Sequence, residues 1–297
     1  MPTPADTRFA TEDLQARLRH HVFILAGEIG ERHVWRFPAL QAAAHYIRGE
    51  WESMGFRVGA QGYEVDGRWC ENLEIMLPGA ERRSEIILAG AHYDTVQGSP
   101  GADDNASGVA ALIEIARLLR NICARRSVKL VAFVNEEPPF FYFGEMGSAV
   151  YAQAARRRGD IQVMLSLEML GCYLAEAGSQ AYPPLLARFY PNRGNFIAFV
   201  SNLRSFRQLR RAVSAFKASS ALQCESLASP AIVPGVSWSD QLSFWRAGYR
   251  AVMVTDTAFY RNPHYHSPRD TPDTLDYATM SQVVEGLAGT LRVLADG

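Results

Sequence analysis

EIILAGAHYDTVQGSPGADDNASG, residues 85–108, joins an apolar run to a loop that is dense in charged and polar groups. The run EIILA is typical of a buried strand, and the loop after it holds one histidine and three aspartates. Carboxylates that lie close together repel one another unless a cation offsets their charge. The stretch therefore predicts a buried strand whose carboxyl end opens on a cation site.

Outward from this stretch, the chain alternates between predicted strands and helices. Helices are predicted over residues 11–27 (with Thr11 as the N-cap), 38–54, 106–121, 146–157, 203–217 and 277–294. Strands are predicted over residues 56–65, 72–77, 85–91, 128–134, 161–167, 196–200 and 249–255. This order predicts an α/β fold: a single domain over residues 1–297 with a mixed, mostly parallel central sheet flanked by helices on both faces.

Charge and hydropathy exclude several classes of partner. Thirty basic and 31 acidic side chains give a net charge of −1, so no global field attracts nucleic acid or an anionic membrane. No apolar run approaches the ~18 residues of a membrane span, and the N-terminus MPTPADTRFATED lacks the apolar segment of a secretory signal. We therefore expect a cytoplasmic location, although export stays open if a signal was removed. The oligomeric state is also open.

Chemistry-bearing side chains follow the ends of several predicted strands. In open α/β sheets the loops at the carboxyl ends of the strands converge, so these side chains are expected at one rim. They are His92, Asp94, Asp104, Glu136, Glu137, Glu168 and His266. Singly, each has an ordinary structural explanation, such as a helix cap for Asp104 or a solvated surface charge for Glu168.

Together, these oxygen and imidazole donors predict a metal centre, because so many acids on one rim need a cation. Without a thiolate among them, the donors suit zinc, cobalt or manganese better than calcium or an iron–sulfur cluster.

Five short motifs, in this order along the chain, resemble the co-catalytic two-zinc aminopeptidase family. They are GAHYDTV, PGADDNASG, NEE, LSLEMLG and YHSPRDT. The similarity extends from GERH at Gly30 through DTPDTLDY at Asp270, which is nearly the whole chain. The family includes bacterial leucyl aminopeptidases and glutamate carboxypeptidases, with glutaminyl cyclases among its relatives. The resemblance implies a zinc-dependent exopeptidase fold and two zinc ions per chain.

The resemblance also assigns the metal ligands. It implies that Asp104 bridges the two zinc ions, that His92 and Glu168 complete one site, and that Glu137 and His266 complete the other. The sequence departs from the commonest family pattern at Glu168, where many members carry aspartate. Glutamate is also an ordinary zinc ligand, so we still expect metal at this position, and whether both sites are filled stays open.

Three further residues receive catalytic roles from the same resemblance. Glu136 corresponds to the general base, Asp94 to the residue that holds the ring of His92, and Tyr265 to a tyrosine that stabilises the oxyanion in the carboxypeptidase branch. Core packing is the competing explanation for Tyr265. The resemblance further implies a cis peptide bond between Asp104 and Asn105.

The leading interpretation is an aminopeptidase that hydrolyses peptide or aminoacyl substrates through a metal-bridged water. Carboxypeptidase action, a single-zinc acyltransferase of the glutaminyl cyclase type and a non-enzymatic binding domain stay open as alternatives. The preferred side chain is not readable from the sequence, because the specificity pocket is built from loops such as residues 171–194.

Overall fold

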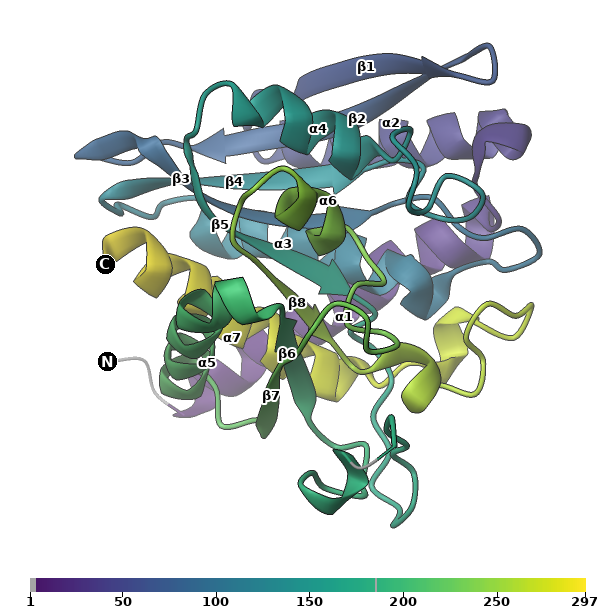
Figure 1. The fold of residues 1–297 in the computed structure, drawn as a ribbon, viewed down its shortest axis with the longest axis vertical. Coiled ribbons are helices and arrows are strands. Elements are labelled where there is room, and N and C mark those ends of the chain that lie inside the picture. Colours follow the sequence, from purple (N-terminus) through teal and green to yellow (C-terminus); the bar gives the residue numbers. More distant parts are fainter. Residues whose placement is uncertain (1–3, 185) are drawn as a thin grey trace.

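A sheet of eight strands forms the centre of the part of the chain that the structure describes, residues 4–184 and 186–297 of a computed structural model (Figure 1). The strands lie in the spatial order β1-β2-β4-β3-β5-β8-β6-β7. Their bounds are Gly59–Val65 (β1), Arg68–Leu77 (β2), Arg82–His92 (β3), Arg126–Phe133 (β4), Ile161–Glu168 (β5), Ile197–Ser201 (β6), Cys224–Ala228 (β7) and Ala251–Thr255 (β8).

The pairing of the strands confirms the predicted mixed, mostly parallel sheet. Parallel pairs join β4, β3, β5 and β8 in the middle of the sheet, and β6 with β7 at one edge. Antiparallel pairs join β1, β2 and β4 at the other edge and β6 to β8. The hairpin between β1 and β2 turns at Asp66 and Gly67, whose positive φ angles of 48° and 69° are those of a tight hairpin turn.

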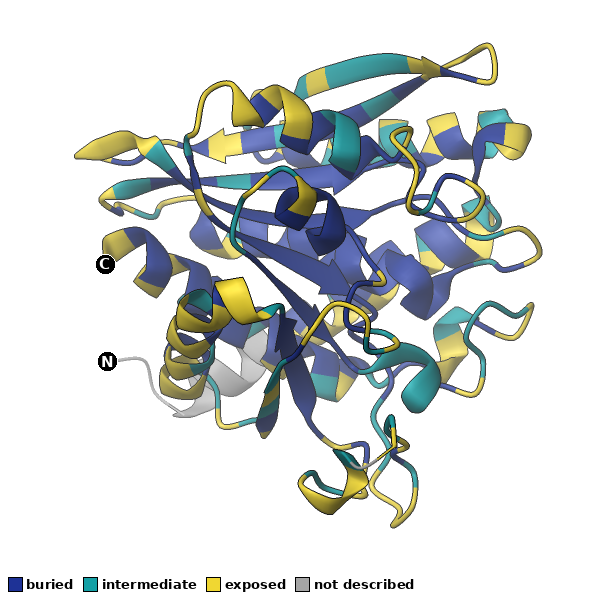
Figure 2. Cartoon of the chain, in the orientation of Figure 1, coloured by how far each residue is buried: buried dark blue, intermediate teal, exposed yellow. Residues whose placement is uncertain are grey.

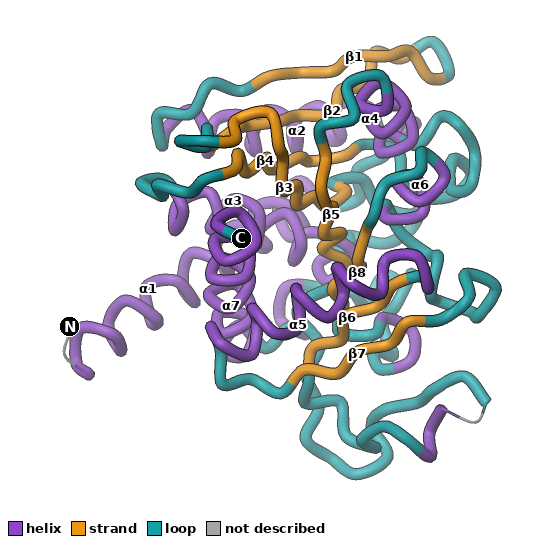
Figure 3. Tube along the Cα trace, turned by 60° about the vertical axis from the view of Figure 1, so that its left-hand side comes forward, coloured by secondary structure: helices purple, strands orange, loops and turns teal. Residues whose placement is uncertain are grey.

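Helices cover both faces of this sheet, as predicted (Figure 3). One hydrophobic cluster joins α1, α2, α3, α5 and α7 to one face, and a second joins α4 and α6 to the other. The central strands are consequently buried on both sides, whereas the edge strands β1 and β7 are partly exposed (Figure 2). The helix bounds are Pro4–Val22 (α1), Phe37–Ser53 (α2), Gly108–Leu119 (α3), Gly147–Arg156 (α4), Phe206–Ser219 (α5), Gln241–Arg246 (α6) and Tyr277–Asp296 (α7).

The structure departs from the predicted elements in three respects. Strand β7 and helix α6 were not predicted, because CESLA shows no apolar alternation and a helix of six residues is too short to show a helical period. Helix α1 begins at Pro4, so Thr11 lies inside it instead of capping it. Proline suits the first position of a helix because its missing N–H has no partner there. Among the described helices, none is long and apolar enough to cross a membrane.

Candidate metal centre

Three neighbouring parallel strands deliver candidate ligands to one edge of the sheet. His92 is the last residue of β3, Glu168 is the last residue of β5, and Glu136 and Glu137 follow the end of β4 after two intervening residues. Because β4, β3 and β5 are parallel and adjacent, their carboxyl ends lie side by side. The structure therefore brings these four predicted site residues to one edge of the sheet.

Two further candidates reach the same edge from loops. Asp104 lies in the irregular turn of residues 102–107 before α3, and His266 lies in the segment between β8 and α7. The peptide bond between Asp104 and Asn105 is cis, as the family resemblance implies. His266 has a positive φ of 52°, a conformation that few residues other than glycine adopt. The local backbone thus brings both side chains to the ends of the strands.

The five candidate ligands gather in two sets around the carboxylate of Asp104. Its Oδ1 lies 3.3 Å from Nε2 of His92, and that nitrogen lies 3.4 Å from Oε2 of Glu168. Its Oδ2 lies 3.1 Å from Nε2 of His266, which lies 3.3 Å from Oε2 of Glu137. Each oxygen of Asp104 therefore faces a separate pair of donors, which is the arrangement that a carboxylate bridging two ions requires.

The spacing of the donor atoms suits a small divalent cation, and some of these atoms have no hydrogen-bond partner in the described part of the chain. Nε2 of His92 and Oε1 of Glu137 are buried and have no hydrogen-bond partner among the described residues. Ligands at about 2.0–2.1 Å from a tetrahedral zinc ion lie about 3.3 Å apart by simple geometry. The four distances of 3.1–3.4 Å around Asp104 match that spacing. The residues present are therefore suited to hold zinc.

The electrostatics of the cluster also favour cations. Burial and the charge of Asp104 raise the pKa of Glu137 to about 7. Burial alone lowers the pKa of His266, but hydrogen bonds and charges of Asp104 and Glu137 outweigh burial and raise it to about 10. Both shifts indicate that the surroundings of the cluster favour positive charge, whether protons or metal ions supply it. Zinc binding must therefore displace protons.

Glu136 lies beside the two sets but belongs to neither. Its Oε2 is 3.8 Å from Nε2 of His92, farther than any of the paired donors, and the residue is 5% exposed. Burial, with the charges of Glu137 and Glu168, raises the pKa of Glu136 well above its usual value. A carboxylate with these properties can accept a proton in a water-poor site and later return it.

Asp94 organises the loop that carries both glutamates. Its two carboxylate oxygens accept hydrogen bonds from the backbone N–H groups of Glu136 and Glu137, at 3.0 and 3.1 Å. Nδ1 of His92 lies 3.2 Å from the backbone carbonyl of Asp94 and 3.6 Å from its carboxylate. The backbone carbonyl is thus the nearer partner of the ring, and the carboxylate chiefly fixes the loop.

Asp270 holds the loop of Asp104 by hydrogen bonds, as Asp94 holds the loop of the two glutamates. Its two oxygens accept hydrogen bonds from the N–H groups of Asp103 and Asp104, at 2.9 and 3.0 Å. The sequence alone did not predict this role. The acid in YHSPRDT was the available signal, but only the folded chain brings it to residues more than 160 positions away.

Two further side chains, which the sequence analysis did not identify, hold candidate ligands in place. The side chain of Asn105 accepts from the N–H of Met169 and donates to the carbonyl of Leu167, which ties the Asp104 loop to the end of β5. The hydroxyl of Ser239 donates to Oε2 of Glu168 at 2.6 Å. Glu168 therefore stays in the cluster despite being one methylene longer than aspartate.

Tyr265 lies against the metal centre. Its ring stacks on His266, with 3.8 Å between centroids and 17° between planes. Burial, with the charges of Asp104 and Glu137, raises its pKa, so its hydroxyl remains a hydrogen-bond donor. This side chain can therefore pack against His266 and can also donate a hydrogen bond to a bound molecule.

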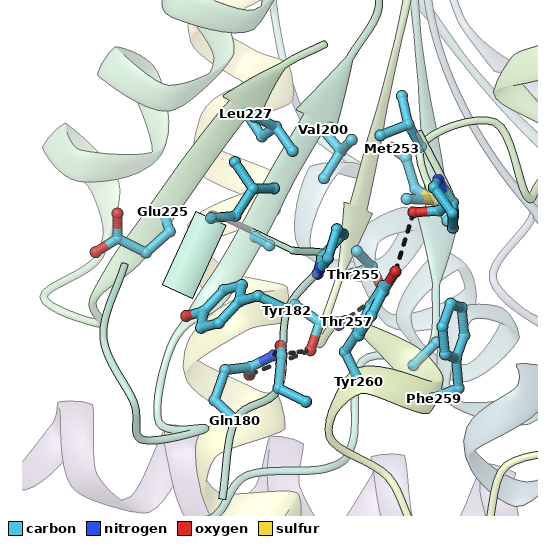
Figure 4. A pocket seen from close by; sticks show the side chains of 18 of the residues that line it. Gln180, Tyr182, Val200, Glu225, Leu227, Met253, Thr255, Thr257, Phe259 and Tyr260 are labelled. Atoms are coloured by element: carbon cyan, nitrogen blue, oxygen red, sulfur yellow. Dashed lines mark hydrogen bonds between the residues drawn. The ribbon is translucent and has the colours of Figure 1, made fainter. Parts of the chain in front are cut away.

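An apolar pocket opens beside the metal centre (Figure 4). Glu168 and Tyr265 line its inner end, and Tyr182, Met253 and Phe259 are among its walls. The loop of residues 171–194 contributes several lining residues, as expected: Gln180, Ala181, Tyr182, Pro183, Leu186 and Tyr190. The pocket can therefore receive an apolar group that extends from the metal centre.

A second buried cluster, Asp103, Cys172 and Asp256, has a different character. The carboxylate of Asp103 accepts hydrogen bonds from Gly171 and Asn262, and that of Asp256 accepts from Cys172 and Ala258. Every carboxylate oxygen of this cluster is thus already satisfied. The geometry indicates a structural support behind Asp104.

The sequence matches known peptidases over most of its length. Residues 72–291 match the model of peptidase family M28. The chain is 40% identical to the uncharacterized protein YfbL of Escherichia coli (strain K12) over 294 residues, 96% of this chain and 88% of that relative. It is 25% identical to a probable leucine aminopeptidase of Arthroderma otae over 235 residues, 74% of this chain and 55% of that relative.

Solved structures share the fold at lower identity. BSAP, a zinc aminopeptidase from Bacillus subtilis, has a TM-score of 0.75, covers 95% of both chains and is 14% identical. A glutaminyl cyclase from Fimbriiglobus ruber has a TM-score of 0.69, covers 94% of this chain and 95% of its own, and is 19% identical. These likenesses show a common fold, which different activities can share.

Proposed function

Since this chain belongs to peptidase family M28, we propose that it is a zinc-dependent aminopeptidase, which removes N-terminal residues from peptides. The chain is a hydrolase of the metallopeptidase class. The observation that carries the proposal is the division of the ligands into two sets around Asp104, one facing each carboxylate oxygen.

In this proposal Asp104 would be a ligand of two zinc ions. His92 and Glu168 would hold one ion, and Glu137 and His266 would hold the other. When bound, such a pair of ions supplies a nucleophilic water at neutral pH and polarises the scissile carbonyl. The protein's own contribution is to fix the ligands through the amide contacts of Asp94 and Asp270.

Glu136 is the proposed general base. Its carboxylate lies at the edge of the cluster, so it can accept a proton from the attacking water and return it to the leaving amine. Asp94 holds the backbone of both glutamates, which leaves Glu137 on the metal side while Glu136 faces the substrate. The adjacent acids thereby serve different tasks.

The charges around the site favour aminopeptidase over carboxypeptidase action. A carboxypeptidase must bind the negative C-terminus of its substrate, for which arginine or lysine is the usual partner. None of the described residues that line the pocket is an arginine, a lysine or a histidine. The charged residues of that lining are acids, Glu168 and Glu225, which suit a positively charged substrate group better than a C-terminal carboxylate.

Hydrolysis assays separate the candidate activities. We expect the zinc-loaded protein to release free amino acids from aminoacyl nitroanilides and unblocked dipeptides, and to lose this activity with a chelator until zinc is restored. Dipeptides blocked at the N-terminus should be poor substrates. Release of C-terminal residues from blocked dipeptides would indicate a carboxypeptidase. Cyclisation of N-terminal glutamine without hydrolysis, in a protein holding one zinc ion, would indicate a glutaminyl cyclase.

We expect Tyr265→Phe to lower kcat by about 10-fold or more with little change in zinc content, because it removes one hydrogen-bond donor from the site of developing charge. The stacking on His266 is kept in this variant, so packing alone predicts no loss. Steady-state kinetics and elemental analysis of the same preparations measure both quantities. Unchanged kcat would refute the proposed role of the hydroxyl.

A further inference from the structure

The floor of the apolar pocket is a row of residues that crosses four strands. The strand registers pair Glu168 of β5 with Thr255 of β8, Thr255 with Ala198 of β6, and Ala198 with Glu225 of β7. All four residues line the pocket, so they lie on one face of the sheet. Neighbouring strands are about 4.8 Å apart, which makes the row about 14 Å long. The pocket therefore runs from the metal centre to the edge of the sheet.

The middle of this row is left open. Ala198 and Thr255, in the middle of this row, have small side chains. The neighbouring row, Leu227, Val200 and Met253, adds apolar side chains to the floor of the pocket (Figure 4). The aromatic rings of Tyr182, Phe259 and Tyr260 stand around it. A short side chain anchored at the metal centre would leave the β7 end of the pocket unfilled.

A carboxylate stands at that far end. Glu225 and Glu168 are the charged residues among the described lining, and no cation accompanies them. Glu225 is half-buried, and its side chain makes no hydrogen bond or ion pair with any residue of the described chain. It lies near the rings of Tyr182 and Tyr190. Burial, with the charge of Glu225, raises the pKa of Tyr182 to about 12.

Resting on the proposed function, we propose that this pocket binds the side chain of the N-terminal residue and that Glu225 selects a long basic side chain, arginine or lysine. The apolar floor and the rings contact the aliphatic stem, as long cationic side chains commonly bury their stems and keep their charged ends with a polar partner. The aromatic walls also attract a guanidinium or ammonium group. Glu225 has no competing partner and can turn toward the bound cation.

Substrates that differ in charge but not in size test this proposal. The nitroanilides of arginine and of citrulline, its neutral isostere, are compared by kcat/KM on the zinc-loaded protein. We expect a preference for arginine of about 10- to 100-fold, the usual worth of a hydrogen bond to a charged group. Glu225→Gln should bring the arginine-to-citrulline ratio close to one. Glu64→Gln, an acid on the opposite edge strand β1, is the matched control and should leave the ratio unchanged.

A second variant tests the length of the pocket independently of charge. Ala198→Leu fills the middle of the row, and we expect it to lower the ratio of arginine to alanine nitroanilide hydrolysis by about 10-fold or more. An unchanged ratio would mean that the side chain of the substrate does not lie in this pocket.

The outcomes keep this proposal apart from the proposed function. If leucine and alanine substrates are hydrolysed but arginine is not preferred over citrulline, or if Glu225→Gln leaves the preference intact, the assigned selectivity is wrong and the aminopeptidase remains. If no aminoacyl substrate is hydrolysed, the proposed function fails and the subsite fails with it.

Discussion

Glu136→Gln is expected to lower kcat by about 10²- to 10⁴-fold, the usual contribution of a general base. Glutamine has the size and shape of glutamate, so it keeps the packing of a residue that is 5% exposed. It cannot accept the proton of the attacking water. Because the side chain of Glu136 lies 3.8 Å from His92 and outside both ligand sets, zinc content should stay as in the unchanged protein.

Two measurements decide this prediction. Elemental analysis of the purified variant reports the metal, and steady-state kinetics on the best aminoacyl substrate reports turnover. Glu145→Gln, an exposed acid on the same loop, is the matched control and should behave like the unchanged protein. Full activity of Glu136→Gln would disprove the assigned base, whereas loss of zinc would place Glu136 among the ligands.

Asp104→Asn is expected to abolish activity by removing the shared ligand. An amide presents one oxygen and no negative charge, whereas Asp104 turns one carboxylate oxygen toward His92 and the other toward His266. At least one of the two zinc ions should be lost, and the other should bind more weakly. Elemental analysis and kinetics measure both effects.

The same variant tests whether bound zinc stabilises the folded protein through Asp104. Zinc should raise the Tm of the unchanged protein, because a ligand that binds only the folded state stabilises it. Zinc should raise the Tm of Asp104→Asn much less. With chelator present, the variant should be less stable than the unchanged protein. Burial alone raises the pKa of Asp104, but its hydrogen bonds and ion pairs with His266 and His92 lower it overall, so the variant loses favourable charge pairing. Asp273→Asn, at an exposed acid, is the control. Equal stabilisation of both proteins by zinc would contradict the bridging role.

Local patterns in the sequence predicted most of the strands, and also the strand ends that carry the candidate metal ligands. The run EIILA and the acids after it predicted both β3 and the convergence at its carboxyl end, because parallel strands share the direction of their ends. The short edge strand β7 gave no such pattern, since its half-buried residues need no alternation. The antiparallel direction of β6 was also not readable, because strand direction depends on how distant segments pack.

Residues that act through backbone contacts were the hardest to predict. Asp94 and Asp270 each hold two amide groups, and nothing in their neighbouring sequence identifies those partners. The role proposed for Glu225 could not be predicted from the sequence for a related reason. Its proposed role comes from the register that aligns it with Glu168 across the two intervening strands, β8 and β6, and a register is a property of the folded sheet.

The two-ion centre is tested most directly by diffraction from crystals of the zinc-loaded protein on both sides of the zinc absorption edge. We predict two anomalous peaks, one between Asp104, His92 and Glu168 and the other between Asp104, Glu137 and His266. A single peak would favour a one-zinc enzyme over the proposed pair. The absence of any peak at Asp104, or zinc bound elsewhere on the chain, would contradict the account.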